Sequence, residues 1–252
     1  YGAAQAIALA AGYLVYFTFP LYPRLLSGGS ERDVAALLKM LLMFAVPITF
    51  GVISLSDSYL TVLKPLYADA KIVLILLALD MLCLSLMRIP RIIVAGVEDI
   101  DEKARIPLKE LVKSRLFHFY TIPYLKTAIG VPAALLTLTV LPREPLSSAL
   151  YVAAVMLLTD LVALLYGVRI ARGCMEVKFP WRNLANYITA SIVMSTFLLS
   201  VPHPTTLSKT GMLTLAGACI YFSIVTIIDN EARFLAKTAV SELWRNLSKL
   251  KI

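Results

Sequence analysis

Long apolar stretches that recur along the chain constrain its fold more than any other feature of the sequence. A helix needs about 20 predominantly apolar residues to cross the hydrocarbon core of a bilayer, and seven stretches of the chain meet that requirement. They cover residues 2–22, 37–63, 70–97, 117–141, 146–168, 184–202 and 211–229. Hydrophobic residues make up 59% of the chain and its mean hydropathy is +0.80, far above the range of soluble domains. The sequence therefore predicts an all-α integral membrane protein with about seven transmembrane helices.

Lysine and arginine residues are distributed unequally between the alternate sides that these stretches define. If the first stretch runs toward the cytoplasm, four of the 24 basic residues fall on the outer side and the remaining twenty fall on the inner side. The four are Lys64, Lys71, Arg143 and Lys209. Lys126, inside the fourth stretch, counts on the inner side. Because short cytoplasmic loops carry the excess of Lys and Arg, we predict a multi-pass protein of the cell membrane with a cytoplasmic C-terminus.

The polar segments between the stretches divide the chain into three parts. Residues 1–170 hold about five transmembrane helices and a cytoplasmic loop, 98–116, in which an acidic run precedes a basic amphipathic segment. Residues 171–229 add two further transmembrane helices. Residues 230–252 form an amphipathic tail, which we expect to lie on the inner membrane surface. Because the chain begins at Tyr1 and enters an apolar stretch at once, we expect it to be a piece of a longer protein.

Composition and motifs argue against several classes of function. The net charge of +8 comes from basic residues that flank apolar stretches, so nucleic acid is not an expected partner. The three cysteines show no paired spacing, and His118 and His203 lack companions at metal-ligand spacing, so no metal site is expected. Because the chain shows no nucleophile elbow, glycine-rich phosphate loop or paired acids, we expect no catalytic residues, no cofactor and no enzyme activity.

Ionisable side chains inside the apolar stretches are the candidate functional residues. A charge at the centre of a membrane helix costs about 2.5–3.5 kcal/mol, so it requires a partner, a watery cavity or a role. Asp80 lies near the middle of the third stretch and Asp160 near the middle of the fifth. Asp57 lies nearer the outer end of the second stretch, where water can reach it. Asp80 and Asp160 either take up a proton or cation, or pair with groups on neighbouring helices.

Two arginines follow Asp80 toward the predicted inner side. Eleven residues of helix turn by about 1100°, so Arg91 stands almost in line with Asp80, and Arg88 lies about 80° away. Arginine grips phosphate through paired N–H donors. One interpretation is therefore a polar cavity in which Arg88 and Arg91 bind a phosphate group. The alternative is that both arginines extend toward the lipid headgroups of the inner surface.

Short patterns along the chain resemble those of one transporter family. Residues 19–24 (Phe-Pro-Leu-Tyr-Pro-Arg), the Gly-Gly-Ser-Glu turn at 28–31, Lys39, and Ala-Val-Pro at 45–47 resemble the polysaccharide-biosynthesis flippases of the multidrug/oligosaccharidyl-lipid/polysaccharide exporter superfamily. Residues 60–70, 179–184, 220–221 and 229–233 are also similar to stretches of this family. At Lys64 and Pro65 the chain departs from the family's usual Leu-Leu-Tyr-Gly-like turn.

The resemblance implies both a fold and a function. The chain would form the second lobe and terminal helix pair of a MATE-like transporter, with the N-terminal half of the same transporter as its partner. It would translocate a lipid-linked oligosaccharide, a polysaccharide precursor, across the cytoplasmic membrane by alternating access, in contact with membrane lipid. The candidate residues for binding the substrate headgroup are Arg88, Arg91, Arg24 and Lys39. One alternative is an ion-coupled exporter of small amphipathic compounds that uses Asp80 and Asp160; another is a membrane scaffold without transport activity.

Overall fold

Helices make up nearly all of the chain that the structure describes. The computed structural model describes residues 1–13, 30–97, 112–140, 144–229 and 232–233, and within these ranges it contains no β-strand. The α-helices are α1 (Gly2–Gly12), α3 (Glu31–Ser54), α4 (Ser56–Leu63), α5 (Lys71–Val97), α7 (Arg115–Val140), α8 (Pro145–Arg172), α9 (Trp181–Ser200) and α10 (Leu207–Ile228). A 3₁₀ helix, η2 (Pro65–Ala70), joins α4 to α5. The predicted all-α architecture is confirmed.

Five helical segments in the described residues are long and apolar enough to cross a membrane. They are Glu31–Ser54, Pro65–Val97, Arg115–Val140, Pro145–Cys174 and Leu207–Ile228. In length and apolar composition these segments are compatible with the multi-pass membrane protein that the sequence predicts. Helix α9 has 20 residues but begins with the polar sequence Trp-Arg-Asn-Leu-Ala-Asn, and it is not among the five. Because the first apolar stretch is described only to residue 13, the count of seven stays a prediction.

The predicted stretch 37–63 differs most from the structure, which begins this helical segment earlier and divides it in two. Helix α3 begins at Glu31 because Ser30 and Asp33 form a capping box, with the Ser30 backbone N–H donating to Asp33 Oδ2 at 2.9 Å. The division from α4 falls at Leu55, between two serines that hydrogen-bond back to the preceding turn. Such back-bonding bends helices, and a hydrophobicity count does not detect it.

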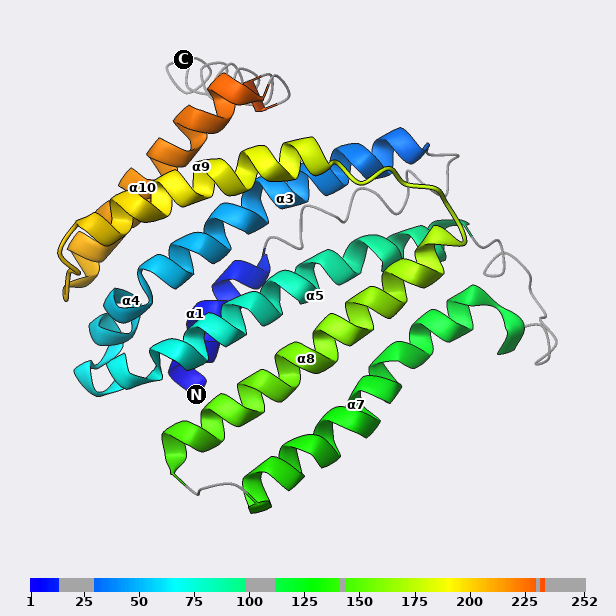
Figure 1. Ribbon diagram of the computed structural model, residues 1–252, viewed down its shortest axis with the longest axis horizontal. Coiled ribbons are helices and arrows are strands. Elements are labelled where there is room, and N and C mark those ends of the chain that lie inside the picture. The colour runs from blue at the N-terminus through cyan, green and yellow to red at the C-terminus, as the bar shows by residue number, and fades with distance from the viewer. Residues whose placement is uncertain (14–29, 98–111, 141–143, 230–231, 234–252) are drawn as a thin grey trace, which may run out of the picture.

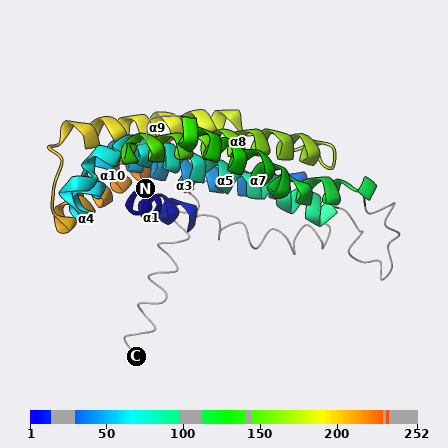
Figure 2. The same ribbon diagram turned by 90° about the horizontal axis from the view of Figure 1, so that it is seen from below.

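The long helices lie side by side in the order α9, α3, α5, α8, α7. Helices α5 and α8 run in one direction, and α9, α3 and α7 run in the opposite direction (Figure 1). Helix α10 packs against α9, and α1 packs against α5 on one face of the array (Figure 2). Helix α8 thus lies between α5 and α7. A Cβ atom at Gly167 of α8 would lie 2.8 Å from Met87 Cε of α5 and 3.2 Å from Phe119 of α7. The missing side chain at Gly167 therefore allows three helices to approach closely, as small residues do between membrane helices.

The two ends of the array differ in charge. Because α5, α8 and α10 run opposite to α3, α7 and α9, the ends of the first three helices lie toward the same end of the array as the starts of the other three (Figure 1). The described Lys and Arg residues near this end, the basic end, are Arg32, Lys39, Arg91, Lys113, Arg115, Arg169, Arg172, Lys178, Arg182 and Arg233. The described ones at the opposite end are Lys64, Lys71 and Lys209. The asymmetry predicted from the sequence is therefore an asymmetry between helix ends, and the cytoplasmic assignment of the basic end stays a prediction.

Three sequence predictions lie partly or wholly outside the described residues. Arg24 lies outside them altogether, as does the first part of the predicted loop, 98–111. Of the predicted amphipathic tail only residues 232–233 are described. Here Arg233 donates from Nε to the Thr226 carbonyl at 3.0 Å and from Nη2 to the Ile227 carbonyl at 2.9 Å. Arg233 thus satisfies carbonyl groups that the end of α10 leaves without helical partners.

Candidate functional site

An ion pair joins the middles of α7 and α8. Lys126 Nζ lies 2.5 Å from Asp160 Oδ1 and 2.7 Å from Asp160 Oδ2, so the ammonium group contacts both carboxylate oxygens. The Asp160 side chain is 5% exposed and that of Lys126 is 32% exposed. Each charge is therefore neutralised by the neighbouring helix at a depth where an isolated charge would be costly. Of the two interpretations of Asp160 from the sequence, pairing with a neighbouring helix describes its position.

Asp80 extends this pair to a third helix. Its side chain on α5 is only 3% exposed, and within the described part of the chain its Oδ1 atom has no hydrogen-bond partner. The Asp80 carboxyl group interacts with that of Asp160 and with the charge of Lys126. Two carboxylates in contact repel each other unless a proton or cation lies with them. Asp80, Asp160 and Lys126 together form a charged triad across α5, α8 and α7.

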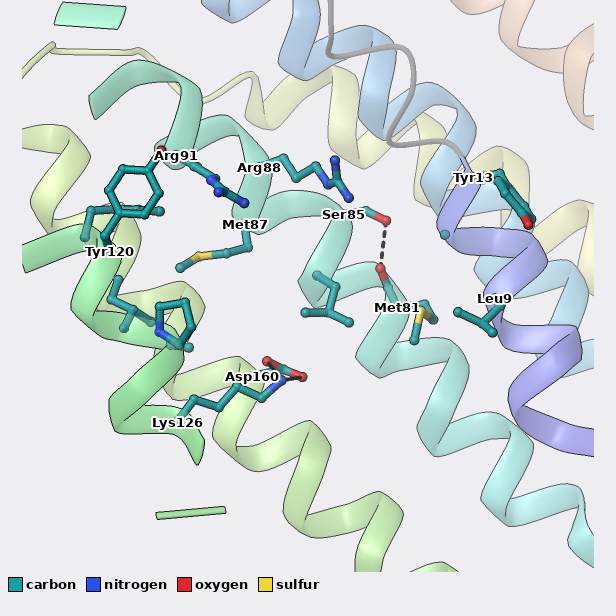
Figure 3. A pocket seen from close by; sticks show the side chains of 16 residues that line it. Leu9, Tyr13, Met81, Ser85, Met87, Arg88, Arg91, Tyr120, Lys126 and Asp160 are labelled. Carbon is teal, nitrogen blue, oxygen red and sulfur yellow. Dashed lines mark hydrogen bonds and ion pairs between the residues drawn. The ribbon is translucent and has the colours of Figure 1, made fainter. Parts of the chain in front are cut away.

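A cavity of about 600 Å³ lies beside the triad, bordered by α1, α5, α7 and α8 (Figure 3). Its polar and aromatic lining includes Arg88, Arg91, Tyr120, Lys126 and Asp160. The Arg91 guanidinium lies over the Tyr120 ring, 5.3 Å from its centroid, and this cation–π contact holds the arginine against the wall. Apolar side chains such as Leu9, Met81 and Met87 line much of the rest. The cavity thus combines an apolar wall with two arginines toward the basic end and a lysine nearer the middle of the helices.

The structure brings together some of the predicted site residues and separates others. Arg88, Arg91 and Asp160 line the one cavity, whereas Asp80 lies behind its wall and is not part of the lining. Asp80 and the two arginines therefore do not all line this cavity. Lys39 lies on α3 and does not line the cavity.

Lys126 is a site residue that the sequence did not predict. By its position in the chain it counts among the inner-side charges, but it lies in the middle of α7 and contacts Asp160. The available signal was a lysine inside one apolar stretch and an aspartate inside the next, because two consecutive stretches form antiparallel neighbours. A cation and an anion in the middle of such neighbours are placed to meet.

Asp57, the third aspartate that the sequence singles out, belongs to a different environment. It pairs with Lys71 across the turn between α4 and α5, with Lys71 Nζ 2.5 Å from Asp57 Oδ2. The two side chains are 36% and 44% exposed, respectively. This accessible pair agrees with the predicted position of Asp57 near one end of the membrane, and it provides no buried site.

A second buried polar cluster lies near the basic end. Asp229, which follows α10, is 6% exposed, and its Oδ2 atom accepts hydrogen bonds from Asn183 Nδ2 at 2.9 Å and from the Tyr187 hydroxyl at 2.7 Å. The Tyr221 hydroxyl donates to the carbonyl of Met43 at 2.7 Å. These bonds connect α10 to α9 and to α3, and none of these residues lines the cavity. The cluster fixes helix packing.

Comparisons of the chain with protein-family models, with curated proteins and with solved structures found no match. The function therefore has to be argued from the cavity and the charged triad. Guanidinium groups bind phosphate or carboxylate through charge-assisted hydrogen bonds. The arginine-containing end of the cavity can accommodate an anionic group, and the apolar walls can accommodate the uncharged part of the same molecule.

Proposed function

We propose that this protein is a membrane transporter that translocates an anionic amphiphile, with Arg88 and Arg91 binding the anionic headgroup. The observation that carries the proposal is that both arginines and the Lys126–Asp160 pair line one cavity beside helices able to cross a membrane. A charged headgroup crosses a membrane only where fixed charges and water replace its hydration, while its apolar part stays in lipid-like surroundings. The cavity supplies both environments.

The specific substrate class that we propose is a lipid-linked oligosaccharide with a phosphate in its headgroup. This choice rests on the resemblance of the chain to polysaccharide-biosynthesis flippases and on the phosphate-binding chemistry of arginine. Alternating access would require a second, MATE-like lobe against the cavity, which in that family is the N-terminal half of the transporter. The basic end would face the cytoplasm, where the substrate headgroup would enter.

A second candidate function is favoured by one observation. The Asp80 and Asp160 side chains are both buried and their carboxyl groups interact electrostatically, and Asp80 Oδ1 has no hydrogen-bond partner among the described residues. A carboxyl pair of this kind can exchange a proton or cation during transport. The protein would then be an ion-coupled exporter of small amphipathic compounds, in which Asp80 and Asp160 are essential and the arginines are dispensable.

The proposed flippase activity can be tested in vesicles. The substrate is a polyprenyl diphosphate bearing a fluorescent sugar, and a membrane-impermeant reductant added outside quenches only the headgroups in the outer leaflet. We expect the double variant R88A/R91A to lower the rate of headgroup translocation at least about tenfold, since one hydrogen bond to a charged group contributes about 1.5–3 kcal/mol. R172A is the matched control, because Arg172 is an exposed arginine near the basic end that does not line the cavity.

The two candidate functions give opposite results in the same vesicles. Wild-type translocation by R88A/R91A would refute the headgroup role of the arginines. If transport of a small amphipathic dye then depends on a proton gradient and is lost in D80N/D160N, the exporter function is supported instead. A fluorescent glycolipid with the same tail but no phosphate serves as a further control, because its translocation should not respond to removal of the arginines.

A further inference from the structure

An apolar groove of about 400 Å³ lies between α7 and α8, next to the cavity. Ile129 of α7 and Leu158 and Val162 of α8 line it with side chains that are 62%, 61% and 65% exposed. Thr159 and Tyr166 complete much of the α8 wall. In a membrane this groove would face hydrocarbon, so an apolar lining alone would mark it only as lipid-facing surface.

Unlike the rest of the apolar surface, this groove shares part of its lining with the cavity. Ile122, Lys126 and Ala163 line both hollows, so these side chains separate them. Among the described residues that line the groove, only Lys126 is charged, and its ammonium group is bound to Asp160, which lines the cavity. The aliphatic stem of a lysine can contact apolar surface while its charged end reaches a polar site. The groove is therefore apolar up to the wall that carries the charges.

We propose that this α7–α8 groove binds the apolar tail of the same amphiphile whose anionic headgroup occupies the cavity, and this inference rests on the proposed function. The headgroup would contact Arg88 and Arg91, and the chain would leave between α7 and α8 beside Ala163. Tail and headgroup then lie on opposite sides of one wall of side chains. Each part of the molecule meets the chemistry that suits it, because the charged part avoids hydrocarbon and the apolar part avoids the cations.

The depth of the shared wall favours this occupant over an ordinary phospholipid. The Lys126–Asp160 pair lies in the middle of α7 and α8, where the groove adjoins the cavity. A bilayer phospholipid keeps its headgroup at the membrane surface, so its acyl chains approach this depth with no polar group attached there. A molecule whose headgroup has entered the cavity has its tail next to this wall, and the groove is the hollow that adjoins it.

The position of the tail can be measured directly. A polyprenyl phosphate with a photoreactive diazirine in its tail is added to the protein in vesicles, activated by light, and mapped to peptides by mass spectrometry. We expect labelling to concentrate on residues 122–129 and 158–166 and to fall at least about tenfold with a large excess of unlabelled polyprenyl phosphate, but not with excess phosphatidylcholine. Labelling that spreads evenly over the exposed faces of α9 and α10 would overturn the proposal. Labelling that excess phosphatidylcholine reduces as much as excess polyprenyl phosphate does would also overturn it, because the groove would then bind bulk lipid.

A pair of bulky substitutions separates this inference from the proposed function. Ile129 lines the groove and Leu136 does not, yet both are on α7 and are 62% and 64% exposed. We expect I129W to reduce both tail labelling and headgroup translocation about tenfold, because it fills the groove, and we expect L136W to change neither. If R88A/R91A stops translocation while I129W transports and labels like wild type, the flippase function stands and the groove assignment is wrong. If R88A/R91A transports normally, the proposed function itself fails.

Discussion

Removing the positive charge of Lys126 should destabilise the protein far more than removing an equivalent surface charge. Truncating one partner of a buried ion pair costs about 3–5 kcal/mol, because the other charge stays buried without compensation. Insertion scales give about 2.5–3.5 kcal/mol for a charge at the centre of a membrane helix. In K126M the 5% exposed Asp160 would lose its cation and would keep the carboxyl group of Asp80 nearby, which repels it. We therefore expect K126M to lower the free energy of unfolding by about 3 kcal/mol.

The chain contains its own control for this prediction. The Asp57–Lys71 pair has the same 2.5 Å N–O distance, but its side chains are 36% and 44% exposed. Exposed pairs contribute about 0–1 kcal/mol, so K71M should be nearly neutral. In the double variant K126M/D160L both buried charges are replaced by apolar groups, and we expect stability to return to within about 1 kcal/mol of wild type, as happens when whole buried pairs are replaced.

The measurement is reversible unfolding in mixed micelles with an increasing fraction of sodium dodecyl sulfate, followed by circular dichroism. The four proteins to compare are wild type, K126M, K71M and K126M/D160L. A destabilisation of K126M below about 1 kcal/mol, or one equal to that of K71M, would refute the argument that burial makes the pair energetically important. A double variant no more stable than K126M would show that Asp160 is not the source of the cost.

Two further predictions use the same unfolding assay. G167L should destabilise the protein by about 1–3 kcal/mol, because the new side chain overlaps α5 and α7. The control G211L should change the free energy of unfolding by no more than about 0.5 kcal/mol, since a Cβ atom there meets nothing within 4 Å. Equal effects of the two substitutions would disprove the close approach at Gly167. Y187F should lower the free energy of unfolding by about 1.5–3 kcal/mol, because the lost hydroxyl donates to the buried Asp229. Y221F loses a hydrogen bond to a neutral carbonyl and should lower it by about 0.5–1.5 kcal/mol. A larger loss in Y221F than in Y187F would contradict the stronger hydrogen bond that we assign to Tyr187.

The positions of the helices could be predicted from the sequence because hydrophobicity and the width of a bilayer determine them together. The predicted stretch 70–97 corresponds to α5 at Lys71–Val97, and 117–141 corresponds to α7 at Arg115–Val140. The division at Leu55 escaped prediction because it coincides with hydrogen bonds from Ser54 and Ser56 to backbone carbonyls, which do not change the apolar content of the stretch.

The charged triad could be predicted only in part. That Lys126 meets Asp160 follows from two consecutive stretches packing as antiparallel neighbours. The electrostatic interaction of Asp80 with Asp160 depends instead on the packing of α5 against α8, and these two helices are not consecutive in the sequence. Helix rotation decides whether a side chain lines a cavity or lies behind its wall, and a difference of one residue turns a side chain by about 100°. The sequence placed Asp80 almost in line with Arg91, yet of these two residues only Arg91 lines the cavity.

The cations of the cavity lie at different depths, and this difference gives the proposed pathway a direction. Arg88 and Arg91 are exposed and lie nearer the basic end, whereas Lys126 lies deeper and is bound to Asp160. A headgroup that enters from the basic end therefore meets the arginines first. To reach Lys126 it has to displace Asp160, which would leave that carboxylate beside Asp80. Because two buried carboxylates without a cation repel each other, deeper movement of the anion carries a cost unless a proton accompanies it. In the proposed pathway the Lys126–Asp160 pair would thus set how far the headgroup moves along the cavity before a second charge must move with it.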